Sequence, residues 1–496
     1  MHLSNPTFIT FLAYITLMVL IGLAAYRHTR NLADYILGGR RLGSLVTALS
    51  AGASDMSGWL LMGLPGAIYL SGLSEAWIAI GLIIGAYLNW RVVAGRLRMH
   101  TEYHGDALTL PDYFAARFND HSGLLRVISA VVILVFFTLY CASGIVAGAR
   151  LFESTFAMPY EQAIWAGAAA TILYTLLGGF LAVSWTDTVQ ATLMIFALIL
   201  TPVMAMLAIG GVDASAMLIS EVRPEHADLL KGASFIGVVS LLAWGLGYCG
   251  QPHILARFMA ADSVRGLAKA RRIGMTWMVL CLAGACGAGY FGLGYFSLNE
   301  HQAAATVANP ERVFLELAQA LFNPWVAGVI LSAVFAAVMS TLSCQLLVCS
   351  SALTEDLYRQ FLRRGASQLE LVWVGRAMVL LIALLAIYLA ADPDSRVLSL
   401  VGYAWAGFGA AFGPVVVFSV LWGGMNRWGA MAGMVTGALT VVLWKQTGGF
   451  GLGLYEIIPG FALASLAIVL VSKLSGRDLA LAERFARADA AWRQAR

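Results

Sequence analysis

Ala51-Gly-Ala-Ser-Asp55-Met-Ser-Gly-Trp59 places a carboxylate and two serines inside an apolar segment that extends from about residue 45 to residue 70. This segment is otherwise long and apolar enough to cross a bilayer. An ionised aspartate near the middle of a span costs roughly 2.5–3.5 kcal/mol, and no Lys or Arg lies between residues 41 and 91 to offset that cost. Glycines on both sides of the aspartate weaken the helix. The pattern is typical of a small-cation site in a membrane.

The composition of the whole chain is that of a membrane domain. The 496 residues are 60% hydrophobic and 12% charged, whereas soluble domains contain about 25% charged residues. Apolar runs of about 17–25 residues predict an all-α polytopic protein with about 13 transmembrane helices. The expected spans are residues 6–26, 45–71, 75–96, 125–152, 160–182, 187–210, 233–256, 273–297, 325–352, 370–391, 397–422, 429–447 and 455–474.

Positive charge is distributed unevenly between the two sides of this topology. Of 31 Lys and Arg residues, 25 fall in alternate loops and in the C-terminal tail, which share one side. Because basic residues of short loops stay in the cytoplasm, we expect the N-terminus outside and the C-terminus in the cytoplasm. The sequence has no G-x-x-x-x-G-K-[ST] motif, which disfavours an ATP-driven pump.

A second interrupted apolar segment is Trp244-Gly-Leu-Gly-Tyr248-Cys-Gly-Gln-Pro252-His253. Proline removes a helical hydrogen bond and clashes one turn back. Such backbone is tolerated at membrane depth only inside protein or beside a water-filled cavity. The spacing of Trp244, Tyr248 and Pro252 places them along one helix face, as an aromatic wall with one hydroxyl. An ordinary kinked helix, packed through its aromatic residues, is the alternative.

The two interrupted segments open two blocks of five predicted spans. Because five is odd, the blocks have opposite orientations, and interrupted helices at matching positions of inverted halves point to a binding site near the bilayer midplane. The expected units are residues 1–44 (extra helix and cytoplasmic loop), 45–210 (first repeat), 211–232 (extracellular loop), 233–422 (second repeat), 423–475 (two extra helices) and 476–496 (cytoplasmic tail).

A third segment, Ala336-Ala-Val-Met-Ser340-Thr-Leu-Ser343, places three hydroxyls in one mid-membrane turn. Such hydroxyls commonly bond back to a carbonyl one turn earlier, so a purely structural role is the alternative. Carbonyls, hydroxyls and carboxylates are the donors that a small hard cation prefers. Carbonyls freed around Asp55, together with the hydroxyls of Ser340 and Thr341, therefore predict a sodium site.

Four further polar residues are candidates on weaker signals. Asp187 lies at a predicted short turn, and we favour a helix N-cap over a cytoplasmic gate. Arg40 is mainly positive-inside charge, or else the partner of a gate carboxylate. The start signal Asn309-Pro-Glu311 predicts an external helix, either a lid or a helix packed over a loop, with Glu311 as the gating candidate. Tyr140 is either a site hydroxyl or a satisfied buried tyrosine.

Six stretches of the chain resemble the sodium/solute symporter family, and within it the bacterial carriers of proline, and the resemblance extends from about residue 6 to residue 475. Runs of this length are far more specific than a short motif. The stretches are Asp34-Tyr-Ile-Leu-Gly-Gly-Arg40, Leu49-Ser-Ala-Gly-Ala-Ser-Asp-Met-Ser-Gly-Trp-Leu-Leu-Met-Gly63, Leu108-Thr-Leu-Pro-Asp-Tyr-Phe114, Trp244-Gly-Leu-Gly-Tyr248, Gly250-Gln-Pro-His-Ile-Leu-Ala-Arg-Phe258 and Ala337-Val-Met-Ser-Thr-Leu-Ser343.

The resemblance implies a leucine-transporter-type fold, a 5+5 inverted repeat with extra terminal helices. It also implies positions for two bound substrates. The sodium-binding residues would be the carbonyls of Ala53, Met56 and Ala337, the hydroxyls of Ser340 and Thr341, and the nearby carboxylate of Asp55. The residues expected around the solute are Ser57, Gly58, Tyr140, Trp244, Tyr248 and Pro252.

The activity implied by the resemblance is sodium-coupled import of L-proline by alternating access across the bacterial cytoplasmic (inner) membrane. Na⁺ would be the coupling ion, without a cofactor, nucleic acid or required protein partner, in contact with membrane lipid. A sodium symporter for another small solute, such as pantothenate or a different amino acid, is the alternative. A passive channel remains open. An intramembrane enzyme is disfavoured because Asp55 has no second intramembrane aspartate in a G-x-G-D motif.

Overall fold

The computed structural model describes residues 5–26, 36–476 and 478–496. These residues form helices joined by short loops, and the pairing of Leu42 with Ala261 is an isolated β-bridge. Asp34 and Tyr35, which begin the stretch Asp34–Arg40 of the family resemblance, lie outside the described residues.

The helices follow the predicted apolar segments closely. The principal elements are α1 (Pro6–Tyr26), α3 (Ser44–Asp55), α4 (Leu64–Ser71), α5 (Ala76–Leu88), α6 (Gly95–Tyr103), α7 (Leu110–Arg117), α8 (Leu124–Phe156), α9 (Tyr160–Ile209), α10 (Val212–Val222), α11 (Phe235–Leu242), α12 (Pro252–Ala260), α13 (Val264–Leu298), α14 (Ala304–Ala308), α15 (Val313–Leu321), α16 (Pro324–Ser351), α17 (Gln368–Leu389), α18 (Val397–Leu421), α19 (Arg427–Gln446), α20 (Ile457–Leu474) and α21 (Leu479–Ala495).

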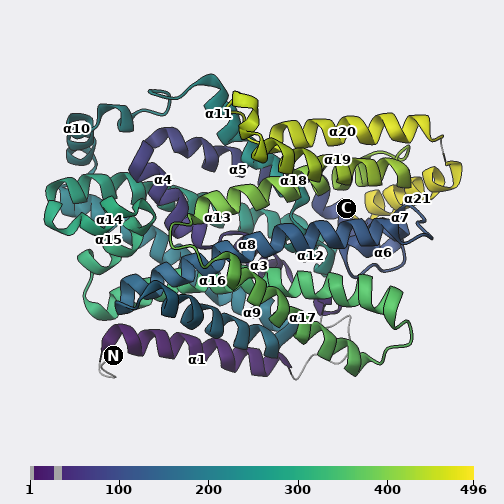
Figure 1. Ribbon diagram of the computed structural model, residues 1–496, viewed down its shortest axis with the longest axis horizontal. Coiled ribbons are helices and arrows are strands. Elements are labelled where there is room, and N and C mark those ends of the chain that lie inside the picture. The colour runs from purple at the N-terminus through teal and green to yellow at the C-terminus, as the bar shows by residue number, and fades with distance from the viewer. Residues whose placement is uncertain (1–4, 27–35, 477) are drawn as a thin grey trace.

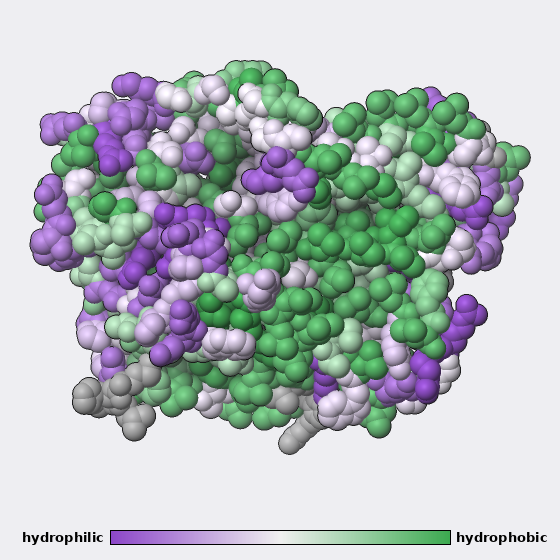
Figure 2. All heavy atoms as spheres, viewed as in Figure 1, coloured by the Kyte–Doolittle hydropathy of each residue, from purple (hydrophilic) through white to green (hydrophobic). Residues whose placement is uncertain are grey.

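The long helices lie side by side along one direction, which gives the molecule two distinct ends (Figure 1). The start of α1, with α10, α14 and α15, lies at one end, and α6, α7 and α21 lie at the other. Figure 2 shows an apolar surface across the middle, with hydrophilic residues gathered toward both ends. This is the surface of a protein that spans a bilayer. The two ends are called the α15 end and the α21 end below.

The predicted number of spans is not confirmed. Among the described residues, nine helices are long and apolar enough to cross a membrane, or ten if the bent pair Phe235–Gly250 and Pro252–Ala260 counts as one span. The predicted spans 160–182 and 187–210 both fall within the range of α9, which consists of two helices that meet at a kink. The backbone at the kink, Gly179, is non-helical, with φ 62° and ψ −170°. Glycine tolerates this backbone, which L side chains rarely adopt.

Both predicted helix interruptions are present. After α3 the chain turns through Met56 and Ser57, forms a π-helical turn at Trp59–Gly63 and continues as α4. After α11 it forms the 3-10 helix η6 (Ala243–Gly250), and α12 then begins at a 45° bend.

The interrupted segments lie in the interior of the helix bundle. α16 is buried along most of its length between α8 and α9, while α18 packs against η6 and α8. Gly58 allows the first interruption to lie directly on α8, because a Cβ at this position would come within 2.5 Å of the Ala147 Cβ.

Candidate functional site

Two backbone carbonyls near the end of α3 lose their helical donors. A regular α-helix would join Ser57 N–H to Ala53 O and Leu60 N–H to Met56 O. Instead, Ser57 N–H donates to Asp55 O at 2.9 Å. Leu60 N–H donates to Ser57 O at 3.0 Å. The carbonyls of Ala53 and Met56 are therefore available to other donors or to a cation.

Two hydroxyls of α16 reach the first of these carbonyls. Ser340 Oγ donates to Ala53 O at 2.7 Å, and Thr341 Oγ1 lies 3.3 Å from the same oxygen. Ser340 Oγ also lies 3.0 Å from Ala337 O. Four of the residues predicted to bind sodium are thus connected to one another. The oxygen donors gathered here are backbone carbonyls and side-chain hydroxyls.

Asp55 connects the two interrupted segments. Tyr248 Oη donates to Asp55 Oδ2 at 2.5 Å, whereas Asp55 Oδ1 is buried without a hydrogen-bond partner among the described residues. The Asp55 carbonyl accepts from Trp59 Nε1 at 3.0 Å and from Tyr140 Oη at 3.4 Å. Ser57 lies beside this group, where its Oγ is 3.4 Å from Trp59 N. One buried residue therefore links α3, α8 and η6.

Aromatic rings surround the second interruption. The centroid of Trp244 lies 6.4 Å from Trp59, 6.5 Å from Trp405 and 5.5 Å from Tyr455. Tyr248 contacts Trp405 edge-on at 5.1 Å. Trp405 and Tyr455 were not predicted. Each lies in an apolar stretch that reads as an ordinary span, and the only signal was a large aromatic residue among small ones at Ala404–Gly407.

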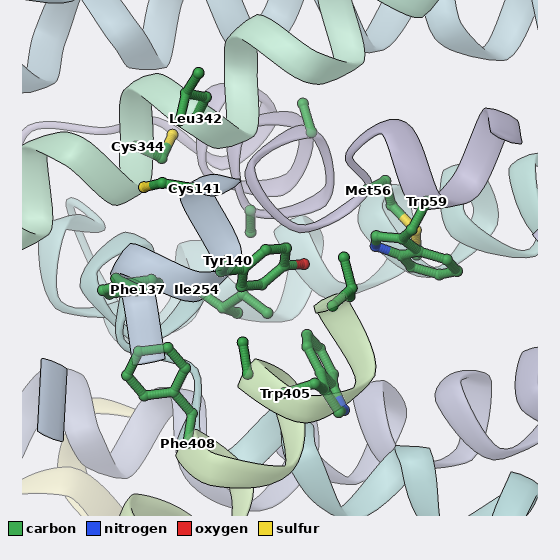
Figure 3. Packing of buried hydrophobic residues seen from close by; sticks show 14 of the residues in the cluster. Met56, Trp59, Phe137, Tyr140, Cys141, Ile254, Leu342, Cys344, Trp405 and Phe408 are labelled. Atoms are coloured by element: carbon green, nitrogen blue, oxygen red, sulfur yellow. The ribbon is translucent and has the colours of Figure 1, made fainter. Parts of the chain in front are cut away.

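Figure 3 shows Tyr140, Met56, Trp59 and Trp405 around the same interior region. The Tyr140 hydroxyl points into this region from α8. The predicted residues Tyr140, Ser57, Trp244 and Tyr248 therefore lie together with Asp55 at one place in the fold.

The prediction that Trp244 and Tyr248 share one face of an α-helix was wrong. Residues 243–250 form a 3-10 helix with three residues per turn, so a spacing of four does not place Trp244 and Tyr248 on one face. η6 instead lies against the backbone of α5, where a Cβ on Gly245 would come within 2.2 Å of Gly81 O. The close approach leaves both aromatic side chains on the interior side.

Pro252 occupies a different position from the other predicted solute residues. It is the first residue of α12 and lines a mostly apolar cavity. The same cavity is lined by Leu37, Leu110 and Leu347, from the segments toward the α21 end. Pro252 thus lines a cavity that none of the other predicted solute residues lines.

Asp187 is not an N-cap, because α9 continues through it and its interruption falls eight residues earlier at Gly179. Its carboxylate is fully buried and forms an ion pair with Arg257 Nη2 at 3.2 Å. Asp187 Oδ2 also accepts from Ser50 Oγ at 2.6 Å, and Arg257 donates to Cys344 Sγ at 2.6 Å. Arg257 was not predicted as a partner, although an arginine in an apolar segment was itself a signal.

Arg40 ties together three segments at the α21 end. Its Nε lies 2.6 Å from Asp106 Oδ1, its Nη2 donates to Ala107 O at 2.8 Å, and its Nη1 donates to Met259 O at 2.7 Å. Asp106 is largely exposed. Arg40 therefore pairs with a carboxylate in the loop that follows α6, and its role at a gate stays a prediction.

Glu311 links the external helix to α18 at the α15 end. Its two carboxylate oxygens accept from Val397 N and Leu398 N, each at 3.0 Å, at the start of α18. A carboxylate is favourable at a helix N-terminus. Burial raises the pKa of Glu311, and the two backbone donors oppose this shift. The predicted helix is present as α15, and the 3-10 turn Pro310–Arg312 precedes it. Asn309 is the N-cap of this turn and accepts from Glu311 N at 3.2 Å.

Comparison with known proteins identifies the family of the chain. The model of the sodium:solute symporter family matches residues 35–437. The sodium/proline symporter of Salmonella typhimurium is 67% identical over 496 residues, covering 100% of this chain and 98% of the relative. The sodium/proline symporter of Escherichia coli K12 is 66% identical over the same length and coverage. The high-affinity proline transporter of Bacillus subtilis is 52% identical, covering 92% of this chain and 96% of the relative.

Solved structures share the fold. A Na⁺-coupled sialic acid symporter in a substrate-bound, outward-open state has a TM-score of 0.80 at 16% identity, with 95% of this chain and 98% of that chain covered. Mhp1, a nucleobase-cation-symport-1 transporter in a closed conformation, has a TM-score of 0.54 at 14% identity, covering 92% and 99%. The leucine-transporter-type fold is thus confirmed, apart from the span count. This multi-pass chain belongs to the sodium:solute symporter family.

Proposed function

We propose that this protein is a symporter that imports L-proline together with Na⁺ across the bacterial inner membrane. The observation that supports sodium coupling best is the Ala53 carbonyl, which is freed from its helix and contacted by Ser340 and Thr341 of α16. The choice of proline is supported by relatives of 66–67% identity that are sodium/proline symporters.

Sodium would bind between the interrupted α3 and α16. The carbonyls of Ala53, Met56 and Ala337 would act with the hydroxyls of Ser340 and Thr341 as neutral oxygen ligands for a hard cation. The single positive charge of the ion would be balanced by the nearby Asp55 carboxylate. These ligands form a cage that combines backbone carbonyls at the end of α3 with hydroxyls of α16. A bound ion therefore favours conformations in which α3 and α16 stay together.

Proline would bind beside this cage, between η6 and α8. Its ammonium group suits the Asp55 carboxylate and the Tyr140 hydroxyl, and its ring suits the apolar faces of Trp244 and Tyr248. Ser57 and the Gly58 backbone would face the amino acid from α3. Asp55 would then contact both substrates, which gives a coupling free energy that is reciprocal between them.

Alternating access requires closure at both ends. At the α15 end Glu311 would hold the external helix on α18. At the α21 end Arg40 would hold the 3-10 turn η1 (Gly38–Arg40) on α12. Asp187 would help to keep the cytoplasmic side closed through its ion pair with Arg257. The excess of Lys and Arg supports an orientation in which the α21 end would lie in the cytoplasm and the N-terminus outside. α15 would therefore act as a lid over the external entrance.

The membrane potential alone supplies enough energy for accumulation. One positive charge that moves down 100 mV releases about 2.3 kcal/mol. Because 1.4 kcal/mol corresponds to tenfold, this supports roughly 45-fold accumulation of the solute. A sodium gradient adds to this value.

Radiolabelled proline uptake into proteoliposomes tests the proposal. A sodium gradient with a negative interior should drive uphill uptake, whereas choline in place of sodium should not. Downhill equilibration without accumulation would indicate a passive channel and refute coupling. Competition by unlabelled pantothenate or another amino acid, at lower concentration than proline, would favour the alternative solute.

A further inference from the structure

Five buried polar atoms at the α21 end have no hydrogen-bond partner among the described residues. They are Nδ1 and Nε2 of His100, Nε2 of His104, and Nη1 and Nη2 of Arg117. All three side chains have 0% exposure. Buried polar atoms in folded proteins nearly always have partners, and a cluster of exceptions indicates water or an ion.

These atoms lie together beneath α21. The Phe485 ring of that helix lies 5.1 Å from Arg117 Cζ and 5.3 Å from the His100 ring. His104 stacks on His100 with ring centroids 5.7 Å apart. Phe118 covers Arg117 from another direction at 5.1 Å. The two phenyl rings therefore shield the guanidinium from solvent, and the cluster joins α6, α7 and α21.

The charged groups that act on the two histidines are cationic, and the carboxylate of Asp489 on α21 pairs with Arg96, whose Nε lies 3.9 Å from Asp489 Oδ1. Arg117 has no ion pair among the described residues, and its single hydrogen bond runs from Nε to Ser419 O at 3.2 Å. Arg96 and Arg484 lie close enough to act on the two histidines. Removing the partner of a buried charge costs several kcal/mol, so a guanidinium without a carboxylate requires another counter-charge.

We propose that His100, His104 and Arg117 form a binding site for one small inorganic anion, chloride or phosphate, enclosed by α21. The two free amino groups of the guanidinium supply the charge and two donors. His100 supplies one ring N–H in either neutral tautomer. The complete burial of all three side chains fits a single small anion rather than a nucleotide or a lipid headgroup.

His104 responds to the anion through its protonation. Its Nδ1 lies 2.9 Å from His100 O and donates to that carbonyl, so Nε2 of the neutral ring is a bare acceptor. Burial, together with the positive charges of Arg117 and Arg484, lowers the pKa of His104 to about 4. A bound anion favours the protonated ring, which adds a further donor. Anion binding therefore strengthens as the pH falls.

Thermal unfolding of the purified full-length protein tests this site. Sodium concentration and ionic strength are held constant while gluconate is replaced by chloride or by phosphate. A ligand that binds only the folded state raises the unfolding temperature saturably. We expect this rise with one of the two anions, and the anion with the lower half-saturating concentration is the ligand. Equal unfolding temperatures in all three salts would mean that water alone fills the cluster, and would overturn the proposal.

Two variants locate the effect. Arg117→Gln should raise the half-saturating anion concentration about tenfold or more, because a hydrogen bond to a charged group is lost. Arg487→Gln is the matched control on α21, since its side chain is 70% exposed, and it should keep the wild-type response. An unchanged response in Arg117→Gln would place the anion elsewhere and refute the assignment.

If Arg117→Gln does not fold, diffraction from wild-type crystals grown in bromide decides the matter for a halide. An anomalous peak beside Arg117 and His100 supports the site. For a phosphate response, ³²P-phosphate binding to wild-type protein, compared with Arg117→Lys, replaces the crystal. The absence of both signals refutes the proposal.

Discussion

Replacing Ser340 by alanine removes the hydroxyl that contacts two carbonyls of the proposed sodium cage. In the structure this hydroxyl lies 2.7 Å from Ala53 O and 3.0 Å from Ala337 O. The variant leaves the Ala53 carbonyl with the Thr341 hydroxyl at 3.3 Å. The backbone break in α3 is unaffected, because it depends on bonds made by Ser57 and Leu60.

The expected change in sodium affinity follows from the difference between the energy of this contact in the sodium-free protein and its energy in the sodium-bound protein. Without the ion, the lost contact is a neutral hydrogen bond worth about 0.5–1.5 kcal/mol. With the ion, the lost contact is charge-assisted and worth about 1.5–3 kcal/mol. The difference of about 1–1.5 kcal/mol corresponds to an increase of about 5- to 13-fold in the sodium concentration that gives half-maximal uptake.

The assay measures initial proline uptake in proteoliposomes as a function of external sodium, at saturating proline. Ser343→Ala is the matched control, since Ser343 Oγ bonds back to Ser340 O at 3.0 Å on the same helix. It should keep the wild-type sodium dependence within about twofold. A wild-type sodium curve for Ser340→Ala would refute the assignment of α16 as a ligand helix.

Three other substitutions are predicted from single contacts. Tyr248→Phe removes a donor to a buried carboxylate at 2.5 Å, so the proline concentration for half-maximal uptake should rise about 10- to 150-fold; an unchanged value would contradict the role of this pair. Arg257→Gln leaves the buried Asp187 unpaired and should destabilise the protein by about 3–5 kcal/mol in thermal unfolding, with partial recovery in the double variant with Asp187→Asn; equal losses in both variants would contradict the pairing. Glu311→Gln should speed amide exchange at the start of α18 about fivefold, from a loss of about 1 kcal/mol at the helix N-terminus; unchanged exchange would show that the carboxylate does not hold α18.

The helix interruptions could be predicted because their causes are local. An aspartate between two glycines weakens a helix wherever it lies, and so does a proline that follows three glycines within eight residues, as in residues 245–252. The hydroxyls of Ser340 and Thr341 could be found for the same reason. Their combination with carbonyls freed around Asp55 was predicted from donor chemistry, whereas the assignment to Ala53, 287 residues from Ser340, came from the family resemblance.

Features that depend on distant packing were missed. The 3-10 helix η6 packs closely against α5 and α18, and nothing within residues 243–250 distinguishes it from a kinked α-helix. The role of Asp187 was also missed. Its local sequence suggested a helix cap, whereas its partner Arg257 lies 70 residues away. The break at Gly179 could not be distinguished from the many glycines that serve helix packing.

High-resolution density obtained in sodium and proline tests the central claim most directly. The account predicts an ion bounded by the carbonyls of Ala53, Met56 and Ala337 and by the hydroxyls of Ser340 and Thr341, and the same density should disappear when choline replaces sodium. An ion bound elsewhere, or a continuous hydrogen-bonded helix through residues 53–60 in the sodium-bound state, would contradict it.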